Sequence, residues 1–240
     1  MARDEAYRKA KKLIQQSRQN RGLNLSSKQL TEVPEEIVTL TQLKELHLSY
    51  NQLTELPDAI ASLTQLKVLK LSGNQLTELP DAIASLTQLQ ELDLSYNKLT
   101  HLPEAIASLT QLQKLNLYFN QLTDLPGAIG SLTHLQELDL ASNKLSNLPE
   151  TLSKLSNLRS LDISWNLLTM LPESLGSLES LEKLTLGNNE IKIIPNLIVK
   201  LKKLTKLSFS SRLKLKPVVT SISLPISVSV SHGTQRERST

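Results

Sequence analysis

The chain has 240 residues, of which 39% are hydrophobic and only 3% aromatic, so leucine must form most of any core. It contains no cysteine, which excludes disulfides, thiol catalysis and cysteine-ligated zinc and suits a reducing, cytoplasmic compartment. The net charge of +4 is unevenly distributed, because residues 1–21 hold seven basic and two acidic side chains and residues 196–240 hold nine basic and one acidic side chain. Residues 22–195 therefore carry a net charge of −9. An acidic central surface would repel phosphates, which argues against nucleic-acid binding.

Residues 1–21 predict a helix that caps the end of the structure that follows. Its less polar side chains recur at helical spacing, at Tyr7, Ala10, Leu13, Ile14 and Ser17. The alternative is a basic amphipathic helix on a membrane surface, but the apolar face is short and lacks bulky anchors, so we favour the cap. The charged N-terminus does not resemble a secretory signal, and no run approaches the roughly 18 apolar residues of a membrane span.

Residues 22–209 follow one pattern with a period of 23 residues, which makes about eight units. The pattern is seen most clearly from Leu89 to Gln111, as LQELDLSYNKLTHLPEAIASLTQ. A fixed period in the 20s is typical of a solenoid, in which each unit contacts only its neighbours. Proline recurs once in each unit, and asparagine recurs at Asn51, Asn74, Asn97, Asn120, Asn143, Asn166 and Asn189.

Each unit predicts one strand and one turn on the opposite side. Polar and apolar residues alternate over 45–49, so Leu46 and Leu48 point inward and the stacked strands form a parallel sheet on the concave face. Proline blocks the sheet and starts a short 3-10, helical or extended segment on the convex face. The asparagines form a structural ladder, because a buried amide can satisfy backbone groups where the chain turns.

The consensus LxxLxLxxNxLTxLPxxIxxLxx resembles the leucine-rich repeat family over about residues 22–209. The 23-residue unit with LPxxI resembles the intracellular class of Ras-group-related scaffolds and bacterial Roco-type proteins. The resemblance implies an α/β solenoid, a horseshoe whose concave parallel sheet binds other proteins. Roco proteins also carry a GTPase domain, but this sequence has no GxxxxGK[ST] and only seven scattered glycines, so nucleotide binding is not predicted.

Residues 210–240 depart from the consensus and form a degenerate last repeat with a Ser/Val-rich tail. From Val218 to Ser231, apolar residues alternate with mostly polar ones, which predicts an amphipathic strand, and Pro225 favours an edge position. Two interpretations stay open. The strand covers the open end of the solenoid, or the tail is truncated, out of frame or disordered; we favour the second because the consensus stops abruptly.

The outward-facing strand positions and the residues just before the asparagines form the candidate binding surface. Carboxylates gather near its middle, and five of the seven aromatic residues lie at its edge. Aromatic side chains among charges are common anchors of protein interfaces, although rings that only stack on adjacent units would give the same pattern. The predicted partner-binding residues are Tyr50, Tyr96, Tyr118, Phe119, Trp165, Glu91, Asp93, Glu137, Asp139 and Asp162.

The sequence predicts no catalytic, cofactor-binding or metal-ligating residues. The four histidines occupy different positions of the unit, there is no HExxH, and Asp93 and Asp139 are two units apart, about 9–10 Å at strand spacing. We therefore predict a non-catalytic cytoplasmic scaffold that binds a basic or mixed-charge protein, such as a small GTPase or another signalling protein, with no cofactor, small-molecule substrate, nucleic acid or membrane span. The alternative is the repeat segment of a larger Roco-type GTPase or other enzyme whose catalytic domain lies outside this chain.

Overall fold

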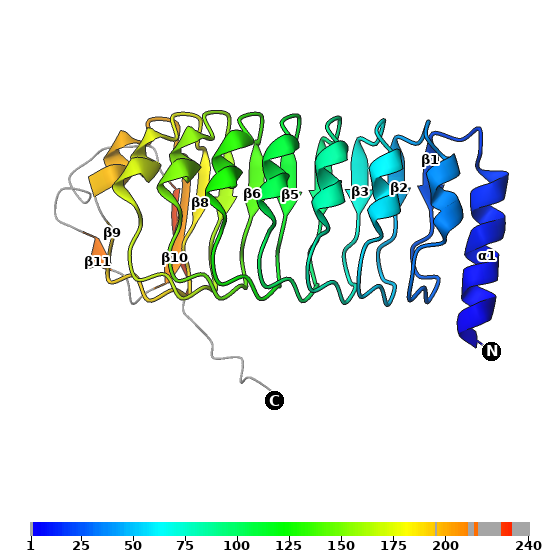
Figure 1. The fold of residues 1–240 in the computed structure, drawn as a ribbon. Coiled ribbons are helices and arrows are strands. Elements are labelled where there is room, and N and C mark those ends of the chain that lie inside the picture. Colours follow the sequence, from blue (N-terminus) through cyan, green and yellow to red (C-terminus); the bar gives the residue numbers. More distant parts are fainter. Residues whose placement is uncertain (1, 195, 211–213, 216–226, 232–240) are drawn as a thin grey trace.

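The computed structural model describes residues 2–194, 196–210, 214–215 and 227–231, and Figure 1 shows a regular stack of coils with a helix at one end. Helix α1 spans Ala2–Gln16. Its residues Ala10 and Ile14 are fully buried, and Lys11 forms an ion pair with Glu36 of the first coil. The helix therefore covers the first end of the leucine core, and the predicted N-terminal cap is confirmed.

One parallel sheet of ten strands lines the concave face, in the order β1-β2-β3-β4-β5-β6-β7-β8-β10-β12. Neighbouring strands from β1 to β10 pair residues 23 positions apart, as in Glu45↔Val68, so equivalent residues of successive coils stand in columns. The strands are β1 Gly22–Asn24, β2 Glu45–His47, β3 Val68–Lys70, β4 Glu91–Asp93, β5 Lys114–Asn116, β6 Glu137–Asp139, β7 Ser160–Asp162, β8 Lys183–Thr185, β10 Lys206–Ser210 and β12 Ser227–Ser231. A separate pair joins β9, Ile193–Ile194, to β11, Lys214–Leu215.

Short 3-10 helices cover the convex face, one in each coil. A proline with φ between −58° and −69° precedes each of the first seven, which suits the start of a helix. The amide of Leu63 closes the helix of its coil by donating to the Ile60 carbonyl at 3.0 Å. The helices are η1 Glu35–Thr39, η2 Asp58–Ser62, η3 Asp81–Ser85, η4 Glu104–Ser108, η5 Gly127–Ser131, η6 Glu150–Lys154, η7 Glu173–Ser177 and η8 Asn196–Lys200.

The core is a continuous column of leucine and isoleucine between the sheet and the 3-10 helices. In the second coil, Leu46 and Leu48 point inward from the strand and meet Ile60 and Leu63, and all four are fully buried. Each coil buries its apolar residues within itself and against the coils on either side, as expected for a solenoid. The predicted solenoid with a concave parallel sheet is confirmed. Within the described residues, no helix has both the length and the apolar character needed to cross a bilayer.

The far end of the sheet is extended by a strand from the tail. Strand β12 pairs in parallel with β10 from Lys206↔Ser227 to Ser210↔Ser231, and the hydroxyls of Ser208 and Ser229 lie 2.6 Å apart. A strand predicted from the alternating pattern is therefore present at Ser227–Ser231, in agreement with the covering-strand interpretation. The rest of the predicted strand, residues 218–226, lies outside the described residues, as do residues 232–240.

Candidate functional site

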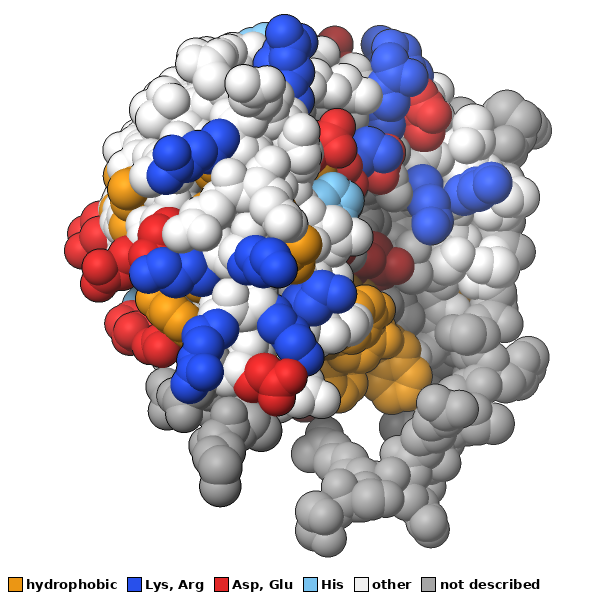
Figure 2. Space-filling view, turned by 90° about the vertical axis from the view of Figure 1, so that its right-hand side faces the viewer, with side chains coloured by type: hydrophobic (Ala, Val, Ile, Leu, Met, Phe, Trp, Pro, Cys, Tyr) orange, Lys and Arg blue, Asp and Glu red, His pale blue; other side chains and the backbone are white. Residues whose placement is uncertain are grey.

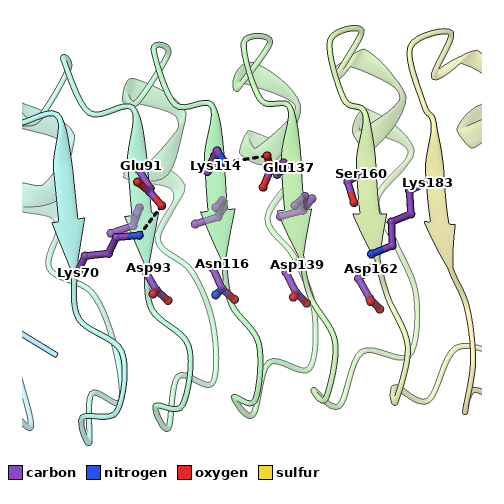
Figure 3. A pocket seen from close by; sticks show the side chains of 13 residues that line it. Lys70, Glu91, Asp93, Lys114, Asn116, Glu137, Asp139, Ser160, Asp162 and Lys183 are labelled. Carbon is purple, nitrogen blue, oxygen red and sulfur yellow. Dashed lines mark hydrogen bonds and ion pairs between the residues drawn. The ribbon is translucent and has the colours of Figure 1, made fainter. Parts of the chain in front are cut away.

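A shallow groove of about 300 Å³ runs across the concave face over strands β3 to β8. Figure 3 shows that its side chains form two rows, because alternate residues of each three-residue strand point outward. Glu91 and Glu137 lie in the upper row, and Asp93, Asp139 and Asp162 lie in the lower row. The structure thus brings all five predicted carboxylates onto one surface.

In the upper row, the predicted glutamates are already paired within the chain. Glu91 forms an ion pair with Lys70, and the Lys114 Nζ lies 2.9 Å from Glu137 Oε1. The Glu137 carboxylate raises the pKa of Lys114 by accepting a hydrogen bond from it. The Lys114–Glu137 pair is exposed, and pairs of that kind contribute little to stability, typically about 0–1 kcal/mol, whereas Lys70 and Glu91 are half-buried. Both pairs neutralise much of the charge that these two glutamates would offer a partner.

In the lower row, each aspartate closes its own strand. One carboxylate oxygen of Asp93, Asp139 and Asp162 accepts the backbone N–H two residues further on, at 3.1, 2.9 and 3.0 Å. Asn116 makes the same bond at 3.0 Å. This short loop, in which an Asp or Asn oxygen replaces a backbone acceptor, is a structural role that our sequence analysis missed.

The lower row nevertheless keeps its negative charge. Among the described residues, none of Asp93, Asp139 and Asp162 has a basic side chain within ion-pair distance; we call these three the acidic row. Asp139 and Asp162 face each other in register on β6 and β7, which is an unfavourable arrangement of like charges. Burial raises the pKa of Asp139, and the charges of Asp162 and Asp93 add to this rise, while the bond from the Ala141 N–H and the charge of Lys183 offset part of it.

The asparagine ladder lies behind the end of the sheet and connects successive coils. The Asn97 Oδ1 accepts the Leu76 N–H at 3.0 Å, while its Nδ2 donates to the carbonyls of Leu94 and Leu71, both at 3.0 Å. The side chains of the other six ladder residues make equivalent bonds, and all but Asn189 are buried. The side-chain amides of the ladder are hydrogen-bonded to the backbone, so they are not available to bind a ligand.

The residue before each ladder asparagine has a left-handed backbone. Its φ is +68° at Gly73 and between +53° and +57° at Tyr50, Tyr96, Phe119, Ser142, Trp165 and Asn188. Glycine and asparagine tolerate this conformation well, whereas aromatic residues rarely adopt it. Gly73 and Asn188 in this column are the sequence signal for the left-handed backbone.

The aromatic side chains in this column are exposed at the margin of the groove. The exposed fractions are 66% for Tyr50, 48% for Tyr96, 54% for Phe119 and 50% for Trp165. Together with half-buried Tyr118 they form what we call the aromatic edge. Figure 2, viewed from the α1 end, shows hydrophobic side chains at the lower margin of the hollow and acidic side chains set back above them.

Three of these rings form a cluster. The Tyr96 ring centroid lies 5.1 Å from that of Tyr118 and 5.2 Å from that of Phe119. Tyr118 stands where the other coils have small residues such as Ser95 and Ala141, and its hydrogen bond to Tyr96 raises the pKa of Tyr96. The rings therefore do stack on adjacent coils, as one interpretation predicted, and yet they stay half-exposed.

The described residues hold no arrangement suited to metal binding. No group of three or more His, Cys, Asp or Glu side chains among them is placed to hold a metal ion. His47 lies on the sheet near Glu45, while the His134 ring nitrogen contacts the Thr110 carbonyl at 2.8 Å, in another part of the unit. His232 lies outside the described residues.

Comparison with known proteins gives matches of one kind. The family models described as "Leucine-rich repeat region" and "Leucine rich repeat" match residues 59–169 and 21–76. A leucine-rich repeat protein of Leptospira interrogans is 32% identical with a TM-score of 0.73, and the match covers 90% of this chain but 62% of that one. The chain thus spans less than two thirds of that relative.

Two further matches are structures of complexes. A structure of the plant peptide hormone receptor RGFR1 with RGF2 is 30% identical with a TM-score of 0.66, covering 82% of this chain and 39% of that one. The octameric complex of latrophilin 3, Unc5D and FLRT2, in which FLRT2 contributes leucine-rich repeats, matches at 25% identity and a TM-score of 0.74, with coverages of 88% and 69%. The comparison with curated proteins gave no match.

Proposed function

The chain is a leucine-rich repeat protein, and from that premise we propose that it is a scaffold that binds an extended segment of a partner protein along its concave face and aromatic edge. The observation that carries this proposal is the backbone of the aromatic edge. Four exposed aromatic residues hold a left-handed conformation that the fold could fill more easily with glycine or asparagine.

A left-handed conformation costs an ordinary L-residue about 1–2 kcal/mol relative to the right-handed one, while glycine avoids the cost. Gly73 and Asn188 show that this solenoid accepts the cheaper residues in the same column. The ring contacts among Tyr96, Tyr118 and Phe119 offset part of the cost, but Trp165 has no such ring contact within the described residues. Strain of this kind gathers at functional sites.

The similar structures support a binding role for this type of fold. One of them is a peptide hormone receptor in complex with RGF2, and another is an assembly of FLRT2 with latrophilin 3 and Unc5D. The chain covers only 39% of the receptor chain, so the partners of those proteins cannot be transferred to it. A protein or peptide ligand is the class of partner that we carry into this proposal.

The narrower parts of the proposal rest on the sequence alone. The unit length of 23 residues and the LPxxI segment support the intracellular, Roco-related class and a signalling partner such as a small GTPase. The lack of cysteine supports a cytoplasmic location. The second candidate is a repeat segment of a larger protein, because the Leptospira leucine-rich repeat protein extends beyond the 62% that is matched; an enzymatic domain in such a protein is a proposal from the Roco resemblance of the sequence alone.

The test is a selection of binders followed by mapping of where they bind. Peptides are selected from a random display library on the full chain, and hydrogen exchange measured by mass spectrometry then locates their binding. We expect protection along β4 to β7 and weaker binding to a variant with Tyr96→Asn and Trp165→Asn. The control is Val38→Asn, which changes an exposed apolar residue on the convex helix η1 and should leave binding unchanged. Protection confined to the 3-10 helices would refute the proposal.

A further inference from the structure

The aromatic edge is interrupted by a small residue at Ser142. Phe119 and Trp165 flank this half-buried serine from the preceding and the following coil, about 9–10 Å apart at strand spacing. Phe119 lies close to Tyr96, with ring centroids 5.2 Å apart, and no contact between the Phe119 and Trp165 rings occurs among the described residues. The space over Ser142 is therefore bounded by an aromatic residue on each side.

The equivalent gap at Gly73 is closed. A Cβ atom placed on Gly73 would lie 2.7 Å from Cδ1 of Tyr50, so the Tyr50 ring already occupies the space beside this glycine. Within the described coils, Gly73 and Ser142 are the two small residues of this column that lie between exposed rings, and Ser142 is the one that carries a polar side chain. This asymmetry singles out one place on an otherwise repetitive surface.

Two carboxylates lie next to this gap. Asp139 precedes Ser142 by three residues and ends the strand of the same coil, and Asp162 is its register partner on the neighbouring strand that leads to Trp165. One oxygen of each carboxylate accepts a backbone N–H, and no basic side chain of the described chain lies within ion-pair distance of either carboxylate. Lys183 on β8 is the nearby cation: its side chain is directed towards Asp162 (Figure 3), and its charge lowers the pKa of Asp139. We call Phe119, Ser142, Trp165, Asp139 and Asp162 the Ser142 notch.

We propose that the Ser142 notch binds an arginine side chain of the partner segment, an inference that rests on the proposed function of the concave face. A guanidinium is flat and stacks on aromatic rings, and its N–H groups can reach two carboxylates at once. It would also relieve the repulsion between Asp139 and Asp162, which face each other in register and which Lys183 does not pair within ion-pair distance. A lysine ammonium lacks the flat, forked shape, and an acidic side chain would add to the repulsion.

The same coil also indicates what accompanies the arginine. Leu167 and Met170 are 43% and 69% exposed, and they follow Trp165 in the chain. The residues equivalent to Leu167 in the other coils, from Gln52 in the second coil to Glu190, are all polar. Of these coils, only that of Leu167 therefore has an apolar side chain at this position. An exposed apolar strip beside the notch suits an apolar residue next to the arginine. The partner segment is therefore expected to contain arginine beside a residue such as leucine.

The experiment uses Trp165, the only tryptophan in the chain, as the reporter. The full chain is titrated with N-acetyl-arginyl-leucine amide while tryptophan fluorescence is recorded at constant ionic strength. Citrulline keeps the shape of arginine without its charge, so the citrulline analogue is expected to bind at least tenfold more weakly. The lysine analogue is expected to bind about threefold more weakly, because its ammonium lacks the forked geometry.

The double variant Asp139→Asn, Asp162→Asn tests the carboxylates. It should weaken binding of the arginine peptide at least tenfold. Both substitutions keep the strand-closing bond, because Asn116 makes that bond at the same position of its coil. The matched control, Asp58→Asn with Asp81→Asn, removes the same charge from exposed convex positions and should leave the affinity unchanged.

The outcomes separate this inference from the broader proposal. No fluorescence response, equal binding of the citrulline analogue, or full binding by the Asp139/Asp162 double variant would each overturn the arginine assignment. Display-selected peptides that protect β4 to β7 without containing arginine would leave the scaffold proposal standing. Arginine-dependent binding at the notch, together with selected peptides that protect only the convex helices, would instead refute the scaffold proposal.

Discussion

Replacement of Asn120 by leucine tests whether the asparagine ladder is structural. The Asn120 Oδ1 accepts the Leu99 N–H at 3.0 Å, and its Nδ2 donates to the carbonyls of Leu94 at 2.9 Å and Leu117 at 3.1 Å. These two carbonyls do not depend on Asn120 alone. The Leu94 carbonyl also accepts from Asn97, and the Leu117 carbonyl also accepts from Asn143, each at 3.0 Å.

The expected loss of stability follows from this sharing. In Asn120→Leu the Leu99 N–H loses the one acceptor that the described chain gives it, which costs about 1–3 kcal/mol for a buried donor. The two carbonyls each lose one of two bonds but stay satisfied, at about 0.5–1.5 kcal/mol each. The buried leucine side chain offsets part of this. We expect the free energy of unfolding to fall by about 2–4 kcal/mol.

The measurement is urea unfolding followed by circular dichroism and by Trp165 fluorescence. The control is Gln121→Leu, which places the same side chain one residue later, where Leu167 already stands in an equivalent position. It removes only an exposed bond of 3.1 Å from Lys144, so we expect a change of less than about 0.5 kcal/mol. The structural role would be refuted by equal stability of the two variants, or by an Asn120→Leu protein that stays stable but no longer binds its peptides.

Three further predictions concern the acidic row, the aromatic edge and the tail. The pKa of Asp139 is raised above the ordinary value of 3.8, so the ionised carboxylate destabilises the fold at neutral pH. Asp139→Asn should therefore raise the free energy of unfolding at pH 7 by up to about 1 kcal/mol. In urea titrations this gain should shrink as the pH falls towards 4, where the wild-type carboxyl group becomes protonated. Replacing Tyr96, Phe119 and Trp165 by asparagine should change the melting temperature little, because relief of the left-handed strain offsets lost ring contacts; a readily unfolding variant would show that the rings mainly stiffen the edge. Deletion of 227–240 removes β12 and should lower the melting temperature by several degrees, whereas deletion of 232–240 should not, and an equal effect of both would contradict a stabilising role for the strand.

The sequence was sufficient to predict the fold because every contact in a solenoid repeats. Once the 23-residue period aligns Leu46 with Leu69, the strand, the buried positions and the convex segment follow for every coil. The left-handed residue before each asparagine was equally periodic, and Gly73 and Asn188 indicated it. The signal is weak because aromatic residues, which rarely adopt this conformation, occupy four of the seven positions before the ladder asparagines.

The details of the candidate site were less predictable. The ion pairs of Glu91 with Lys70 and of Glu137 with Lys114 join neighbouring strands, and the choice of lysine depends on side-chain conformations that the sequence does not determine. The strand-closing bonds of the aspartates did have a signal. Asn24, Asn116 and Asp139 are short polar residues that share the last position of their strands, where such side chains commonly bond the backbone two residues later.

In a repeat protein, the residues that keep the consensus are explained by the fold, so information about a partner must lie in the departures from it. Tyr118 replaces a small residue, and Leu167 and Met170 replace polar ones. These three departures lie in the coils of β5 and β7, on the chain that leaves the concave sheet, and Ser142 lies in the coil between them. Val68 and Ile193 replace polar residues in other coils, so an apolar replacement alone does not mark a binding site. The edge from β5 to β7 differs because its exposed rings and apolar side chains accompany the in-register carboxylates of Asp139 and Asp162, and this combination suits one ligand.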